Sequence, residues 1–132
     1  MVARHLLRHY ALDKPLSAAA PRVTLTAATL RRVFAHIEDR LCGPLRLAEL
    51  ASLAHLSDDH FLRSFKAAVG QTPHQFVLDR RITRSRELLE RSDSSISGVA
   101  LATGFKGASH FSAAFKAHVG VSPTDWRIQR RH

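Results

Sequence analysis

The chain has 132 residues and a single cysteine, Cys42, which excludes an internal disulfide and a thiolate metal cluster. Apolar residues make up 45% of it, but no apolar run approaches the roughly 18 residues that span a bilayer, and Arg and His interrupt the first ten residues too often for a secretory signal. The formal charge is +9, and 16 of the 20 basic residues are arginine, which suits phosphate recognition and leaves DNA, RNA and anionic membrane as candidate partners.

Residues 1–25 are predicted to be a tail. The stretch "RHLLRHYAL" could form a short amphipathic helix, and "KPLSAAAPRV" is a Pro/Ala/Ser linker without periodicity. An apolar helix followed by a linker suggests the end of an upstream domain, which favours a module of a longer protein over the alternative of a stand-alone protein.

Residues 26–71 carry apolar residues at spacings of three and four, which predicts three helices. The first helix ends at Gly43-Pro44, and the second is short and contains Ala51. The third begins after Ser57, which can cap it, and ends at Gly70. Its predicted buried stripe consists of Phe61, Phe65, Ala68 and Val69.

Residues 72–91 are predicted to form a long linking helix. The run Thr72-Pro73-His74-Gln75 has the cap residue, the first-turn proline and the third-position glutamine of a capping box. The helix extends to about Arg91, for a length of roughly 25 Å. The run "SDSS" then ends it.

Residues 92–132 repeat the earlier pattern. "HFLRSFKAAVGQTP" begins at His60 and "HFSAAFKAHVGVSP" at His110, and eight of the 14 positions are identical. Each copy is a short helix, a tight turn and a second helix, which predicts two helix-turn-helix subdomains. The second copy has one extra residue around Lys106-Gly107.

The turn between the helices often needs a residue with positive φ. Gly104 suits this position in the second copy, whereas the first copy has His55, for which we expect a strained but tolerated turn. The predicted fold is therefore all-α, with about seven helices in two helix-turn-helix subdomains joined by a long linking helix.

These residues resemble a known family. The run "ATGF…HF…FK..VG.SP..WR" of the second copy, together with "RRI..SRELL" on the linking helix, resembles the DNA-binding domain of AraC/XylS transcription regulators over residues 26–130. The resemblance implies two recognition helices that enter successive major grooves of double-stranded DNA, and an N-terminal effector-binding or dimerisation domain. It also implies contact with RNA polymerase and a cytoplasmic location at the nucleoid.

The predicted base contacts follow from helix geometry. When the phenylalanines point inward, the outward positions of the first recognition helix include Arg63, which can form the common bidentate contact to guanine. Asp59 can accept from cytosine or simply favour the helix N-terminus, and the remaining candidates flank these positions or repeat them in the second copy. They are Leu62, Ser109, His110, Ser112 and Ala113.

Phosphate contacts are predicted for basic side chains and for helix caps. Lys66 and Lys116 lie near the middle of the two recognition helices, and Arg46 lies beside the start of a short helix, a natural anion site. The remaining candidates are Thr72, Arg80, Arg81, Arg84 and Ser122, and for the three arginines a solvated face is the alternative. One chain is expected to cover about 20 base pairs.

Other classes of function fit less well. The nine histidines include no His-Glu-x-x-His motif, and no Gly-rich phosphate loop or nucleophile motif is present, so we predict no enzyme, metal or cofactor. RNA binding needs exposed aromatic platforms, whereas every phenylalanine here falls on a core stripe or a turn anchor. A protein-interaction module that contacts RNA polymerase and docks on DNA mainly without sequence preference remains the alternative.

Overall fold

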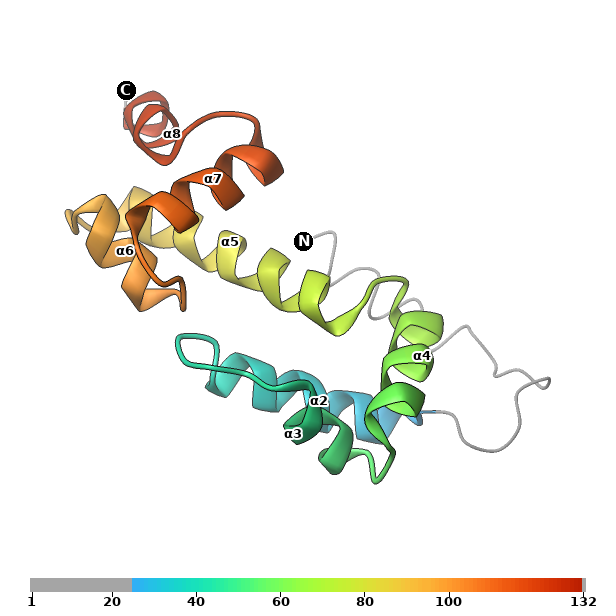
Figure 1. Cartoon of the computed structure of the whole chain (residues 1–132). Helices are drawn as coiled ribbons and strands as arrows, with labels where there is room; N and C mark the ends of the chain where they lie inside the picture. The colour runs from blue at the N-terminus through green and yellow to red at the C-terminus, as the bar shows by residue number, and fades with distance from the viewer. Residues whose placement is uncertain (1–24, 132) are drawn as a thin grey trace. The chain divides into compact units, whose positions relative to one another are not determined.

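The computed structural model describes residues 25–131, so the predicted tail helix and linker lie outside the described residues. The described part contains seven helices and no strand, which confirms the all-α prediction (Figure 1). The helices are α2 (Ala27–Asp39), α3 (Leu47–Leu53), α4 (Asp58–Val69), α5 (Pro73–Arg91), α6 (Ile96–Ala102), α7 (Ala108–Val119) and α8 (Pro123–Arg130). Among them, none combines the length and the apolar character that crossing a bilayer requires.

The described residues divide into two compact units. The first comprises residues 25–40 and 45–77, and the second comprises residues 41–44 and 78–131, so the predicted linking helix contributes to both. Helix α2 ends at Asp39 rather than at Gly43-Pro44. The carbonyls of Leu41 and Gly43 instead accept hydrogen bonds from the Arg81 guanidinium, at 2.9 and 2.7 Å, and this explains why the loop groups with the second unit.

An aromatic cluster forms the core of the first unit. Phe61 and Phe65 of α4 are fully buried, as their stripe predicted, and Phe65 contacts Phe34 of α2 and Phe76 of α5 at centroid distances of 6.0 and 5.8 Å. Phe34 and Phe76 also lie together, at 4.8 Å. Because interlocking rings bury large areas, these contacts hold α2, α4 and the start of α5 as one body.

The core of the second unit repeats this arrangement. Phe111 and Phe115 of α7 are fully buried, and Phe105 packs against Phe111 at 5.2 Å. Phe115 meets the edge of Trp126 at 6.0 Å and 75°, much as Phe65 meets Phe76 at 5.8 Å and 73°. The two copies therefore place the same kind of ring pair behind their second helix.

The two helix-turn-helix turns have the same hydrogen bond. The N–H of Leu56 donates to the carbonyl of Ala51 at 3.1 Å, and the N–H of Phe105 donates to the carbonyl of Ala100 at 2.9 Å. His55 has φ of 58° and Gly104 has φ of 89°, which confirms that both turns need a left-handed residue. Among the described residues, His55 is the only one other than glycine with positive φ.

The extra residue of the second copy alters how its second helix begins. Ser57 caps α4 and accepts a hydrogen bond from the N–H of His60 at 3.2 Å. In the second copy Lys106 is inserted, and Gly107 occupies the cap position, with no side chain to accept such a bond. Helix α7 therefore begins without the cap that α4 has.

This difference predicts that Gly107→Ser will stabilise the chain. Gly107 has an extended backbone with φ of −178°, and a Cβ there would meet no atom within 4 Å, so serine fits without strain. Its hydroxyl can cap α7 while the unfolded chain loses glycine's freedom, and we expect a gain of about 0.5–1 kcal/mol. Urea unfolding measures the change, and Gly107→Ala is the control without a capping oxygen. An equal gain from both variants would contradict the capping explanation.

Candidate nucleic-acid interface

Helix α4 presents an exposed outer face opposite its buried phenylalanines. Asp59, Leu62, Arg63 and Lys66 are all exposed, as the inward placement of the phenylalanines predicted. Leu62 is one of the few large apolar side chains left open, with 36% of its surface exposed. The face combines one acid, one apolar side chain and two cations, a mixture that can meet both base edges and phosphates.

Arg63 is available for an external partner. Within residues 25–131 no hydrogen bond or ion pair involves its guanidinium, so Asp59 does not hold it one helical turn away. Ser57 already caps the helix, which leaves the Asp59 carboxylate to act as a charge in the first turn of α4. A free guanidinium on an exposed helix face can adopt the fork geometry that guanine requires.

Helix α7 presents a chemically simpler outer face. Ser109, His110, Ala113 and Lys116 are exposed, and Ser112 is half-buried. The His110 ring packs edge-on against Phe105 of the turn, with centroids 5.6 Å apart. Apart from Lys116 this face offers only short or partly held side chains, which limits the number of base edges it can reach.

Arg46 occupies the cap position of α3 but cannot cap it through its side chain, because a guanidinium has no acceptor. Instead its backbone N–H donates to Oε1 of Glu49 at 3.4 Å. The other carboxylate oxygen of Glu49 lies 2.6 Å from Nε2 of His36 on α2. The Arg46 side chain is exposed beside the start of α3.

The same contact predicts a pH dependence for the first unit. The hydrogen bond from His36 holds the pKa of Glu49 below its ordinary value of about 4.5. A carboxyl group whose pKa is lower in the folded than in the unfolded chain stabilises the fold at pH values above its ordinary pKa. This stabilisation is lost as the pH falls through the folded-state pKa. We expect the urea midpoint to decrease as the pH is lowered from about 4.5, and we expect a smaller decrease in Glu49→Gln. An unchanged acid dependence in the variant would contradict the assignment.

The helix caps that follow α4 and α7 differ in the charge beside them. Thr72 forms the predicted capping box: its Oγ1 accepts from the N–H of Gln75 at 3.2 Å, and its own N–H donates to Oε1 of Gln75 at 3.1 Å. Ser122 caps α8 by accepting from the N–H of Asp125 at 3.1 Å. The Asp125 carboxylate places a negative charge beside the Ser122 cap, which is unfavourable for an anion there.

The three candidate arginines of α5 lie in different surroundings. Arg84 is exposed, whereas Arg80 is half-buried and already interacts within the chain. The guanidinium of Arg81 is bound to the Leu41 and Gly43 carbonyls, and burial lowers its pKa. We therefore give Arg81 a role in the fold and do not include it among the proposed phosphate contacts.

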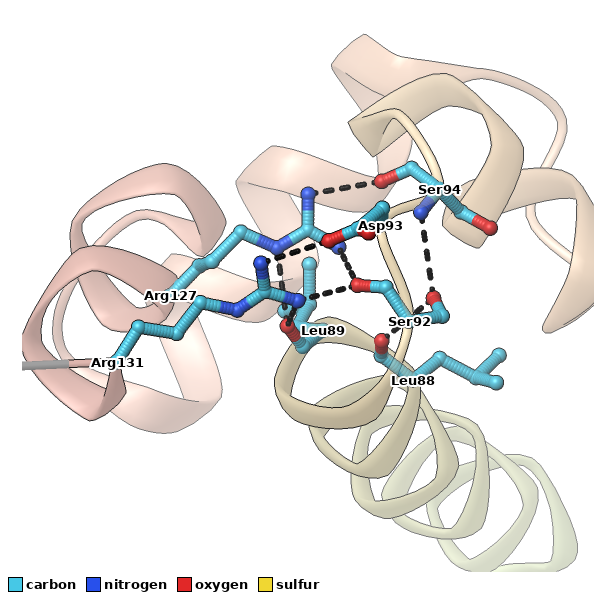
Figure 2. Close-up of polar contacts among 7 residues, drawn as sticks. All are labelled: Leu88, Leu89, Ser92, Asp93, Ser94, Arg127 and Arg131. Carbon is cyan, nitrogen blue, oxygen red and sulfur yellow. Dashed lines mark hydrogen bonds and ion pairs between the residues drawn. The ribbon is translucent and has the colours of Figure 1, made fainter.

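Arg127 of α8 and Arg131, which follows the helix, were not predicted to have any role. Arg127 and Arg131 reach the C-terminal end of α5 and the following residues, where they donate mainly to backbone carbonyls (Figure 2). The sequence contained one signal, because Arg127 belongs to the "SP..WR" run. Its partners could not be predicted, since a carbonyl acceptor has no sequence identity.

Basic residues are unevenly divided between the units. Among the described residues, the first unit has six basic and five acidic side chains, and the second has ten basic and five acidic ones. The second unit therefore carries most of the excess positive charge, although α7 has the simpler outer face. This division favours electrostatic docking by the second unit.

Comparison with known proteins places the chain in a family. A helix-turn-helix domain model matches residues 50–129. The probable transcriptional regulator LumQ of Photobacterium leiognathi is 38% identical over 93 residues, which cover 70% of this chain and 38% of LumQ. The transcriptional activator RhaS of Klebsiella pneumoniae is 32% identical over 114 residues, which cover 86% of this chain and 41% of RhaS. The chain thus spans well under half the length of these relatives.

Solved structures agree. The DNA-binding domain of AdpA, determined in complex with a target DNA, has a TM-score of 0.74 and 30% identity, and the match covers 78% of this chain and 93% of that domain. An AraC-type regulator from Chromobacterium violaceum has a TM-score of 0.72 and 30% identity, with coverage of 78% and 92%. The chain belongs to the AraC/XylS family of transcription regulators, whose helix-turn-helix domain binds DNA sequence-specifically.

Proposed function

We propose that α4 and α7 are the recognition helices and that they contribute differently to DNA binding. Helix α4 contacts bases, chiefly through Arg63, with Asp59 and Leu62 beside it. Helix α7 docks mainly through Lys116 and contacts bases weakly through Ser109, His110, Ser112 and Ala113. The observation that supports this most is the contrast between the free Arg63 guanidinium and the short side chains of α7.

Phosphate contacts complete the proposed interface. Arg46, Lys66, Arg84 and Lys116 are exposed cations on or beside the helices, and Thr72 and Ser122 add hydroxyl donors at two helix starts. Arg80 joins them if it exchanges its contact within the chain for a phosphate. RNA polymerase contact, a cytoplasmic site of action and an upstream effector-binding or dimerisation domain stay predictions from the family resemblance.

Salt dependence tests this interface. Each phosphate that a side chain neutralises adds about 0.9 to the slope of log affinity against log salt, so the four exposed cations predict a slope of about 3–4. Fluorescence anisotropy with a labelled duplex measures it, and single-stranded RNA of the same length is the control. An affinity that does not change with salt concentration, or tighter binding to the RNA than to the duplex, would contradict the proposal.

A further inference from the structure

The C-terminal end of α5 lacks the usual glycine stop. Helices α4 and α7 end at Gly70 and Gly120, which have φ of 92° and 101°, and the N–H of each glycine donates back to a carbonyl of the last turn. Helix α5 ends at Arg91 and is followed by a run of Ser and Asp, in which no residue has positive φ. The N–H and the hydroxyl of Ser92 both donate to the Leu88 carbonyl, at 2.9 and 2.8 Å, whereas the Leu89 carbonyl takes its donors from elsewhere in the chain.

Arg127 of α8 donates to the Leu89 carbonyl and to two carbonyls just beyond α5. Its Nε donates to the carbonyl of Leu89 at 2.9 Å, one terminal nitrogen donates to Ser94 at 2.8 Å, and the other donates to Ser92 at 3.1 Å (Figure 2). One planar guanidinium thus binds three carbonyls, at the end of α5 and in the segment that follows. Its positive charge also lies at the negative end of the α5 dipole.

Arg131, the residue directly after α8, binds two of the same carbonyls. It donates to Leu89 at 3.3 Å and to Ser92, and it forms an ion pair of 2.9 Å with Asp93. The Asp93 side chain is 95% exposed, so this ion pair contributes little. The contribution that Arg131 shares with Arg127 is the pair of hydrogen bonds to the Leu89 and Ser92 carbonyls.

These contacts hold the segment that leads into α6. Ser95 follows immediately and caps α6 by accepting from the N–H of Gly98 at 2.9 Å. Helix α6 precedes α7 in the chain and α8 follows it, and both pack against α7. Arg127 therefore connects α8, which packs against one part of α7, to the segment that positions α6, the other neighbour of α7.

We propose that Arg127 is a positioning residue for DNA binding by α7, with Arg131 as its support. The proposal rests on the proposed role of α7 as a DNA-docking helix. Because three of its nitrogens are bound to carbonyls, Arg127 acts through the placement of α6 and α8 and does not neutralise a phosphate. A lysine cannot replace it, since an ammonium group on a flexible stem lacks the rigid fork that spans three acceptors.

The test uses Arg127→Gln and Arg127→Lys in the full chain, with Arg130→Gln as the matched control. Arg130 lies on the same helix and carries the same charge, but its guanidinium lies over the Trp126 ring, 4.8 Å from the centroid. Both Arg127 variants should weaken binding to a selected duplex about five- to tenfold, the size expected when the net contribution of about one hydrogen bond is lost. Their salt slope should equal that of the wild type, and hydroxyl-radical protection should weaken only in the half-site that faces α7.

Other outcomes overturn the proposal. A slope lower by about 0.9 in Arg127→Gln, with affinity restored in Arg127→Lys, would make Arg127 a phosphate contact. Unchanged affinity in both variants would show that it positions nothing. If circular dichroism shows that either variant is unfolded, Arg131→Lys replaces it and should show the same half-site loss on a smaller scale. A wild type that protects no second half-site would instead refute the proposed role of α7.

Discussion

Gly104→Ala is expected to destabilise the second unit by about 2–5 kcal/mol. Two costs add at this turn. Gly104 has φ of 89°, a conformation that costs a residue with a Cβ about 1–2 kcal/mol. A Cβ there would also lie 2.6 Å from the carbonyl oxygen of Leu41 and 2.7 Å from Nε of Arg81, and relieving such overlap costs typically 1–3 kcal/mol.

Two other variants separate these costs. Gly120 has φ of 101°, but a Cβ on it would meet no atom within 4 Å, so Gly120→Ala should show the backbone cost alone. His55→Gly removes the strained conformation from the equivalent turn of the first unit and should be neutral or stabilising. Urea unfolding of the three variants gives the comparison. Equal losses for Gly104→Ala and Gly120→Ala would show that the Leu41 carbonyl moves away at little cost.

The repeat explains why so much of this fold could be predicted. Two copies of one pattern allow each element to be checked against the other, and the buried phenylalanines, both positive-φ turns and the equivalence of Phe76 and Trp126 all followed from that comparison. The exposed face of α4 followed in turn, because burying Phe61 and Phe65 determines which side chains point outward.

The arginine contacts could not be predicted in the same way. Arg81 and Arg127 bind carbonyls that lie 33–40 residues away in the sequence, at 2.7–3.1 Å, and any residue in those segments offers the same acceptor. Composition alone suggested that arginines in a basic chain bind phosphate. Burial and carbonyl partners, which only the folded chain brings together, separate the structural arginines from exposed ones such as Arg63 and Arg84.

Replacing Arg63 and Lys116 should separate base contact from docking. Arg63→Ala should cost roughly 1–3 kcal/mol on the selected site and relax specificity at about one base pair, because alanine cannot donate to guanine. Lys116→Ala should weaken binding to all sequences similarly and lower the salt slope by about one unit, because it removes one phosphate contact. A randomised-site selection on the wild type and both variants measures specificity, and anisotropy at several salt concentrations measures the slope.

The same selection compares the two half-sites. Ala113 occupies in α7 the position that Arg63 occupies in α4, and it can at most touch a thymine methyl group. Base preferences should therefore be sharper in the half-site that faces α4. An unchanged motif for Arg63→Ala would show that α4 only docks. A sharper second half-site would show that Ser109, His110 and Ser112 determine more of the sequence than their short side chains suggest, and water-mediated contacts to bases are the physical route by which they would do so.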